Sequence, residues 1–139
     1  MSTTLRLLIV DDNEDLADIL HCGFTRLGVT VTCCGDAETC VRLFSHRPPD
    51  VVLVDGKLPG NDGLWLVRQL QTLKPDVPLV MLSGSDDRPF IEAAYAAGIV
   101  QFLLKPCGLA AVRSAVLQAV KRRREQPIQV AESLTDTLS

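Results

Sequence analysis

The sequence predicts a doubly wound α/β fold, in which a five-stranded parallel sheet carries helices on both faces. Two observations lead to this prediction. Five short runs rich in Val, Leu and Ile recur along the 139 residues, and a segment with helical periodicity follows each of them. Strands that are apolar on both faces and alternate with single helices are typical of parallel sheets with right-handed crossovers.

The predicted strands are short and mostly apolar. In chain order they are LRLLIV (5–10), VTVTCC (29–34), DVVLVD (50–55), VPLVML (77–82) and VQFLLK (100–105). β-branched and leucine-rich runs of this length favour buried strands.

Four of the five predicted helices have a clear apolar stripe. The first covers residues 14–27 and places on one face Leu16, Ile19, Leu20, Gly23, Phe24 and Leu27. The same spacing predicts helices over 36–46, 62–74 and 109–123. The segment 86–97 is rich in alanine and contains Pro89, which a helix tolerates only in its first turn. Its modest apolar face predicts loose packing.

Composition and charge fit one globular domain. Hydrophobic residues make up 47% of the chain and charged residues 22%, which argues against disorder of the whole chain. The net charge of −3 argues against direct contact with nucleic acid. No stretch approaches the roughly 20 apolar residues of a membrane span. We therefore expect a cytoplasmic protein that contacts no membrane.

The cysteines and the C-terminal segment carry less information. Five cysteines, an odd number without a CxxC pair, are expected to be small buried thiols. They are Cys22, Cys33, Cys34, Cys40 and Cys107.

We expect a folded domain over residues 1–122 and a polar tail or linker over 123–139. The basic cluster KRRR (121–124) is expected to interact with the negative end of the last helix.

Polar side chains stand at the end of four of the five predicted strands. They are, in chain order, Asp11, Asp12, Asp55, Ser83 and Lys105. Parallel strands end at one edge of the sheet, where such folds bind their ligands, so these groups should converge. Each residue alone could be a helix cap or a turn residue. Together they predict a functional site.

The charges of this set point to a metal ion. Three carboxylates against one ammonium group leave an excess of two negative charges. Neighbouring carboxylates repel each other, so the cluster must protonate or hold a cation. Ligands that are all oxygen suit Mg²⁺. A neutralised site with Ser83 and Lys105 could then accept a phosphoryl group, which predicts phosphoryl chemistry on an aspartate.

Four motifs together resemble the receiver domain of two-component response regulators. They are LLIVDDNED (7–15), VVLVDGKLPGNDG (51–63), LVMLSG (79–84) and FLLKP (102–106). Their order and spacing match that family over residues 5–122. The resemblance implies a flavodoxin-like (βα)5 fold with the strand order 2-1-3-4-5.

The resemblance also implies a role for each acidic residue. Asp55 would accept a phosphoryl group from a phosphohistidine of a partner kinase and form an acyl phosphate. Asp12, Asp55 and the backbone carbonyl of Lys57 would bind Mg²⁺ directly, while Asp11 would contribute mainly through water.

The remaining motif residues would surround the phosphoryl group. Lys105 would pair with it and Ser83 would donate a hydrogen bond to it, while Phe102 would turn inward as Ser83 moves. Pro106 would follow a cis peptide bond. The family usually has a larger apolar side chain where this chain has Gly56, so we expect a more open mouth of the site.

We therefore expect a phosphorylation-controlled switch in signal transduction, with self-directed phosphoryl chemistry and no enzymatic turnover of other substrates. The implied partners are a sensor histidine kinase or phosphotransfer protein and an output domain or protein target. Residues 84–104 would form the surface that changes, because their helix has little packing to resist movement. Residues 84–122 could form a homodimer interface.

Three alternatives stay open. A receiver-like module could act as a scaffold without phosphorylation. An aspartyl-nucleophile phosphatase of the haloacid dehalogenase type would carry a DxD pattern on its first strand, where this chain has adjacent aspartates. A flavodoxin-like nucleotide binder would need a Ser, Thr or Gly phosphate loop after that strand, and DDNED would repel a phosphate.

Overall fold

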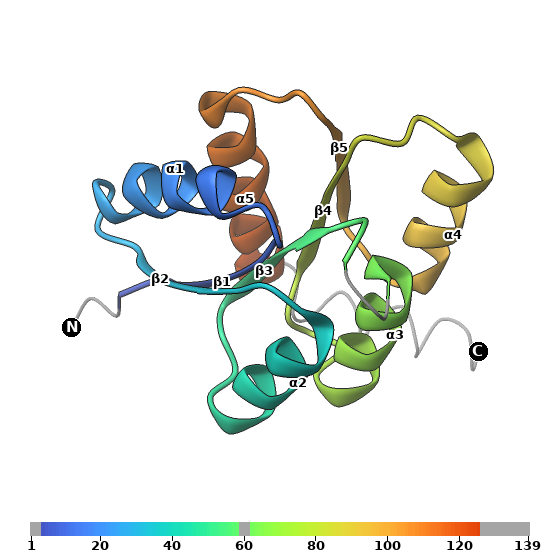
Figure 1. Ribbon diagram of the computed structural model, residues 1–139. Coiled ribbons are helices and arrows are strands. Elements are labelled where there is room, and N and C mark those ends of the chain that lie inside the picture. The colour runs from blue at the N-terminus through green and yellow to red at the C-terminus, as the bar shows by residue number, and fades with distance from the viewer. Residues whose placement is uncertain (1–3, 59–61, 126–139) are drawn as a thin grey trace.

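Strands and helices alternate strictly along the chain, as the sequence predicts. The computed structural model describes residues 4–58 and 62–125. The strands are β1 (Arg6–Val10), β2 (Thr30–Cys34), β3 (Val51–Asp55), β4 (Leu79–Ser83) and β5 (Gln101–Leu104). The helices are α1 (Glu14–Thr25), α2 (Ala37–His46), α3 (Gly63–Leu73), α4 (Arg88–Ala97) and α5 (Leu109–Glu125) (Figure 1).

All five strands are parallel and lie in the order β2-β1-β3-β4-β5, which confirms the predicted fold class and strand order. The strand bounds differ from the predicted ones by one or two residues. The clearest case is β4, which begins at Leu79 rather than Val77. Pro78 precedes it and has no N–H group with which to join the sheet.

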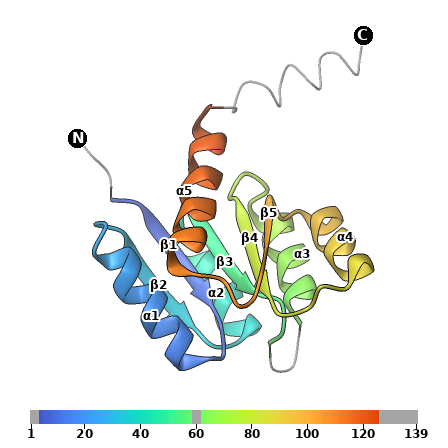
Figure 2. The same cartoon turned by 90° about the horizontal axis from the view of Figure 1, so that it is seen from above.

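Helices cover both faces of the sheet, with α1 and α5 on one face and α2, α3 and α4 on the other (Figures 1 and 2). Successive side chains of β1 point to opposite faces. Leu7 and Ile9 pack with Leu20 and Phe24 under α1. Leu8 belongs to the second core, beneath α2 and α3. The sheet therefore has two cores, one on each face.

Burial falls from the centre of the sheet to its edges. Every residue of β3 and β4 is buried, whereas β2 has no buried residue and β5 is only partly covered.

The prediction of buried cysteines is wrong for four of the five. Only Cys40 is buried, while Cys34 and Cys107 are partly covered, and the two exposed thiols are Cys22 and Cys33. Cys33 and Cys34 lie on β2, an edge strand, and Cys22 lies outside the apolar stripe of α1.

Helices α4 and α5 are held to the sheet very differently. Only Ala94 of α4 is buried, in agreement with the predicted loose packing, and Pro89 stands in its first turn. Gly98, with a φ of 128°, ends the helix and donates its N–H to the carbonyl of Ala94. In contrast, α5 buries a stripe formed by Val112, Ala115, Val116, Ala119 and Val120.

The last helix continues through Glu125, past the predicted domain boundary at residue 122. Within its basic cluster, Arg123 forms an ion pair with Asp76 in which Nη2 and Oδ2 are 3.1 Å apart. The predicted tail lies outside the described residues from 126 onward, so its role stays a prediction. Within the described ranges, no helix has both the length and the apolar composition needed to cross a membrane.

Candidate functional site

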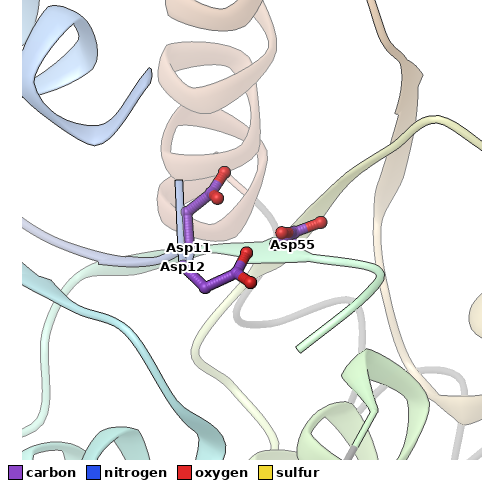
Figure 3. Close-up of side chains that lie close together, drawn as sticks. All are labelled: Asp11, Asp12 and Asp55. Carbon is purple, nitrogen blue, oxygen red and sulfur yellow. The ribbon is translucent and has the colours of Figure 1, made fainter. Parts of the chain in front are cut away.

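Three aspartates meet at the carboxyl edge of the sheet, as predicted. Asp11 and Asp12 directly follow β1, and Asp55 is the last residue of β3 (Figure 3). One carboxylate oxygen from each residue lies within 4.8 Å of the others. Asp11 and Asp55 are buried, whereas Asp12 is exposed and opens the cluster to solvent. The cluster can therefore be reached by an ion from water.

Lys105 comes to the same cluster from the end of β5, also as predicted. Its Nζ lies 3.4 Å from Oδ1 of Asp55 and 3.6 Å from Oδ2 of Asp11. The peptide bond between Lys105 and Pro106 is cis. A single ammonium group cannot balance three carboxylates, so the cluster keeps a negative excess. An oxygen-only donor set with this charge suits Mg²⁺.

Burial makes Asp55 an unusual carboxyl group. The pKa of Asp55 is raised to about 6, first by burial and also by the charge of Asp11. The backbone N–H of Lys57, 3.1 Å from Oδ1, and the ammonium of Lys105 act in the opposite direction. Asp55 is therefore mostly ionised at neutral pH, in a place where its charge is costly.

The helix that follows the cluster, α1, is capped by a residue other than the three aspartates. Asn13 caps α1, because its Oδ1 accepts the N–H of Leu16 at 3.1 Å. Asp11 instead accepts the N–H of Asn13 at 2.8 Å. Glu14 stands in the first turn of α1, where the helix dipole favours a negative charge. Asp11 and Asp12 are thus left to face Asp55.

Gly63 lets α3 begin directly against the site. A Cβ atom at this position would lie 2.6 Å from the backbone oxygen of Asp55 and 2.9 Å from Cα of Gly56. The N–H of Gly63 donates to the carbonyl of Gly56 at 3.3 Å. The preceding loop residues 59–61 lie outside the described residues. The predicted metal contact of the Lys57 carbonyl stays a prediction.

Ser83 stands at the end of β4, beside the acidic cluster. It is 1% exposed, and its Oγ accepts the N–H of Ser85 at 3.2 Å. Its backbone carbonyl accepts the N–H of Lys105 at 2.8 Å, and this hydrogen bond joins the end of β4 to the end of β5. The structure thus brings Ser83 to the predicted edge, while its bond to a phosphoryl group stays a prediction.

The prediction of a more open mouth at Gly56 is wrong. A Cβ atom at Gly56 would lie 2.6 Å from Oγ of Ser83, 2.7 Å from Cβ of Ser83 and 3.3 Å from Cζ of Phe90. The space that a side chain would need is therefore filled by Ser83 and by the ring of Phe90. Because glycine has no Cβ, both can approach the backbone of β3 closely.

Two residues of α4 that the sequence analysis did not single out surround Phe102. The ring of Phe90 packs edge-on against that of Phe102, with centroids 6.3 Å apart and an angle of 78° between the planes. The N–H of Phe102 donates to the hydroxyl oxygen of Tyr95 at 3.0 Å. In the sequence, the signal for Phe90 and Tyr95 is that they are aromatic residues in an otherwise alanine-rich segment. The inward turn of Phe102 stays a prediction.

Comparison with known families and structures gives a consistent result. Residues 7–117 match the sequence model of a family described as the response regulator receiver domain. A CheY-like response regulator receiver domain protein from Methanospirillum hungatei superposes with a TM-score of 0.86 at 20% identity. The alignment covers 89% of this chain and 99% of that one. At this identity the likeness supports the fold alone.

Two further structures are more similar in sequence. A response regulator protein from Burkholderia pseudomallei, whose crystal contains a phosphorylated aspartic acid, a calcium ion and citrate, matches at 25% identity with a TM-score of 0.77. That alignment covers 90% of this chain and 74% of the other. NtrX from Brucella abortus matches at 28% identity with a TM-score of 0.78, over 88% of this chain and 29% of NtrX. The chain thus corresponds to one part of that longer protein.

Proposed function

The chain belongs to the response regulator receiver domain family, and from this premise we propose that it is a phosphorylation-controlled switch with Asp55 as phosphoacceptor. The observation that carries the proposal is the joint position of three carboxylates and one ammonium group. Oxygens of Asp11, Asp12 and Asp55 lie within 4.8 Å of one another, and Lys105 reaches to 3.4 Å from Asp55.

The same residues fit Mg²⁺. Asp12, Asp55 and the backbone carbonyl of Lys57 would bind it directly, and Asp11 mainly through water. The bound ion supplies positive charge that lets an anionic phosphoryl group approach the carboxylates. The Burkholderia pseudomallei regulator, which contains both a phosphorylated aspartic acid and a calcium ion, supports this assignment.

Each side chain then has a defined task in phosphoryl transfer. A carboxylate oxygen of Asp55 attacks the phosphorus of a phosphohistidine, forming an O–P bond as the P–N bond breaks. The departing imidazole nitrogen keeps the electron pair of that bond. Lys105 pairs with the phosphoryl oxygens, and the hydroxyl of Ser83 donates a hydrogen bond to one of them. Since its pKa is about 6, Asp55 is available as the carboxylate at neutral pH.

The partners follow from this reaction. A sensor histidine kinase or a phosphotransfer protein would supply the phosphoryl group, and an output domain or protein target would read the result. Tyr95, Val100, Leu104 and Leu117 are large exposed side chains on or beside α4, β5 and α5, which supports this face as a homodimer interface. Five free thiols support a reducing, cytoplasmic location.

Intact mass after incubation with acetyl phosphate and Mg²⁺ tests the proposal. We expect one phosphoryl adduct on the wild type, none on Asp55→Asn, and a strongly reduced yield without Mg²⁺. Asp36→Asn is the matched control, because Asp36 caps α2 by accepting the N–H of Thr39, and asparagine can do the same. An adduct that survives Asp55→Asn, or no adduct on the wild type, would refute the proposal.

A further inference from the structure

We propose that Phe90 is a positioning residue that transmits the position of Ser83 to helix α4. This inference rests on the proposed function and deepens it, because it names the contact through which phosphorylation of Asp55 would reach the outer surface. Phe90 belongs to none of the motifs that carry the family resemblance.

The first support is the crowding above Gly56. The position of a Cβ atom on Gly56 lies 2.6 and 2.7 Å from two atoms of Ser83 and 3.3 Å from the ring of Phe90. A Cβ atom at these separations would force Ser83 to shift, so glycine suits the present arrangement. The ends of β3 and β4 and the first turn of α4 thus share one small space.

The second support is the present direction of the Ser83 hydroxyl. Its Oγ accepts the N–H of Ser85 at 3.2 Å and borders the space above Gly56. In the proposed switch, Oγ turns toward a phosphoryl group on Asp55, to which it donates its own hydrogen, and so moves out of the space above Gly56. Its departure creates a void, and voids in a packed interior are unfavourable. The ring of Phe90 already borders that void and can fill it.

The third support is the firm attachment of Phe90 to the start of α4. Asp87 caps the helix by accepting the N–H of Phe90 at 3.2 Å. Pro89 precedes Phe90 and restricts the backbone in this turn. A displacement of Phe90 therefore displaces the whole first turn. Because Ala94 is the one buried residue of α4, little packing opposes that movement.

Phe90 also packs edge-on against Phe102 and borders, above Gly56, the space that Ser83 occupies, so one ring lies next to both residues that the family resemblance assigns to switching. The coupling runs from Asp55 through Ser83 to Phe90, and from there to α4 and Phe102.

Hydrogen exchange with a phosphoryl mimic tests this coupling. The amides of residues 88–97 are compared with and without beryllium fluoride and Mg²⁺, in the wild type and in Phe90→Ala, while binding of the mimic is titrated separately. In the wild type, we expect exchange of these amides to change by about fivefold or more on binding, the lower end of usual coupling between sites. In Phe90→Ala, we expect the mimic to bind while the exchange of α4 stays the same.

Ile91→Ala is the matched control, because it removes apolar surface from the neighbouring, similarly half-buried position and should keep the wild-type response. Phe90→Leu retains apolar volume and should recover part of the response. This second variant tests the inference even if Phe90→Ala is unstable. A full α4 response in Phe90→Ala or Phe90→Leu beside a normal wild type would overturn the inference alone. Failure of the mimic to bind the wild type would overturn the proposed function, and this inference with it.

Discussion

The carboxyl edge of the sheet has two halves that are built differently. The acidic half consists of Asp11, Asp12 and Asp55, at the ends of β1 and β3. The aromatic half consists of Ser83, Phe90 and Phe102, at the end of β4, on α4 and on β5. In the acidic half, charge is concentrated where the backbone is buried on both faces. In the aromatic half, the contacts are uncharged and lie beneath a helix with one buried residue.

This difference separates two requirements of a switch. Chemistry at a carboxylate needs ligands in fixed places, and strands in the centre of a sheet provide them. A response needs an element whose displacement is inexpensive, and α4 provides it. The acidic half should therefore respond to mutation through stability and charge, and the aromatic half through small, local changes.

The largest effect is expected from Gly63→Ala in the acidic half. The added Cβ would meet the backbone oxygen of Asp55 at 2.6 Å, and no side-chain rotation can relieve a backbone clash. We expect a loss of roughly 2–4 kcal/mol of unfolding free energy, measured in urea. Gly84→Ala is the matched control beside Ser83, since no atom lies within 4 Å of its Cβ position, and it should change stability by less than about 0.5 kcal/mol. Equal losses of unfolding free energy in Gly63→Ala and Gly84→Ala would contradict the expected backbone clash at Gly63.

An intermediate effect is expected from pH in chelator-treated protein. The pKa of Asp55 is raised from 3.8 to about 6, so between these values the folded state binds more protons than the unfolded state. Asp55 therefore lowers stability as pH rises through this range, by roughly 1–3 kcal/mol in total, and has no further effect above it. The difference between wild type and Asp55→Asn isolates this contribution. Parallel pH profiles of the two proteins would contradict it, and Mg²⁺ should recover the lost stability at pH 7.

The smallest effect is expected from Tyr95→Phe in the aromatic half. This change removes the oxygen that accepts the N–H of Phe102 at 3.0 Å, but Tyr95 is 44% exposed, so water can replace it. We expect a cost of about 0.5–1 kcal/mol and faster exchange of the Phe102 amide. Unchanged exchange at this amide would mean that the hydroxyl does not protect it.

The acidic half could be predicted from the sequence, and the aromatic half only in part. Asp11, Asp55 and Lys105 each end or follow a strand, and parallel strands end at one edge, so local patterns were sufficient. The contact of Phe90 with Gly56 joins segments far apart in the chain through side-chain packing, which no local pattern encodes. The exposure of Cys33 is a different case, because the strand order that the resemblance implied already placed β2 at an edge, and the expectation of buried thiols did not take this into account.

The hydroxyl of Tyr95 has one more consequence. β5 lies at the edge of the sheet, and an open edge offers unpaired backbone donors to strands of other molecules, which is a common route to aggregation. At Phe102 that donor is already engaged within the chain. A second molecule therefore cannot extend the sheet at this position without first displacing the tyrosine. Association on this side is steered toward contacts between side chains, which separate again more readily than a shared sheet.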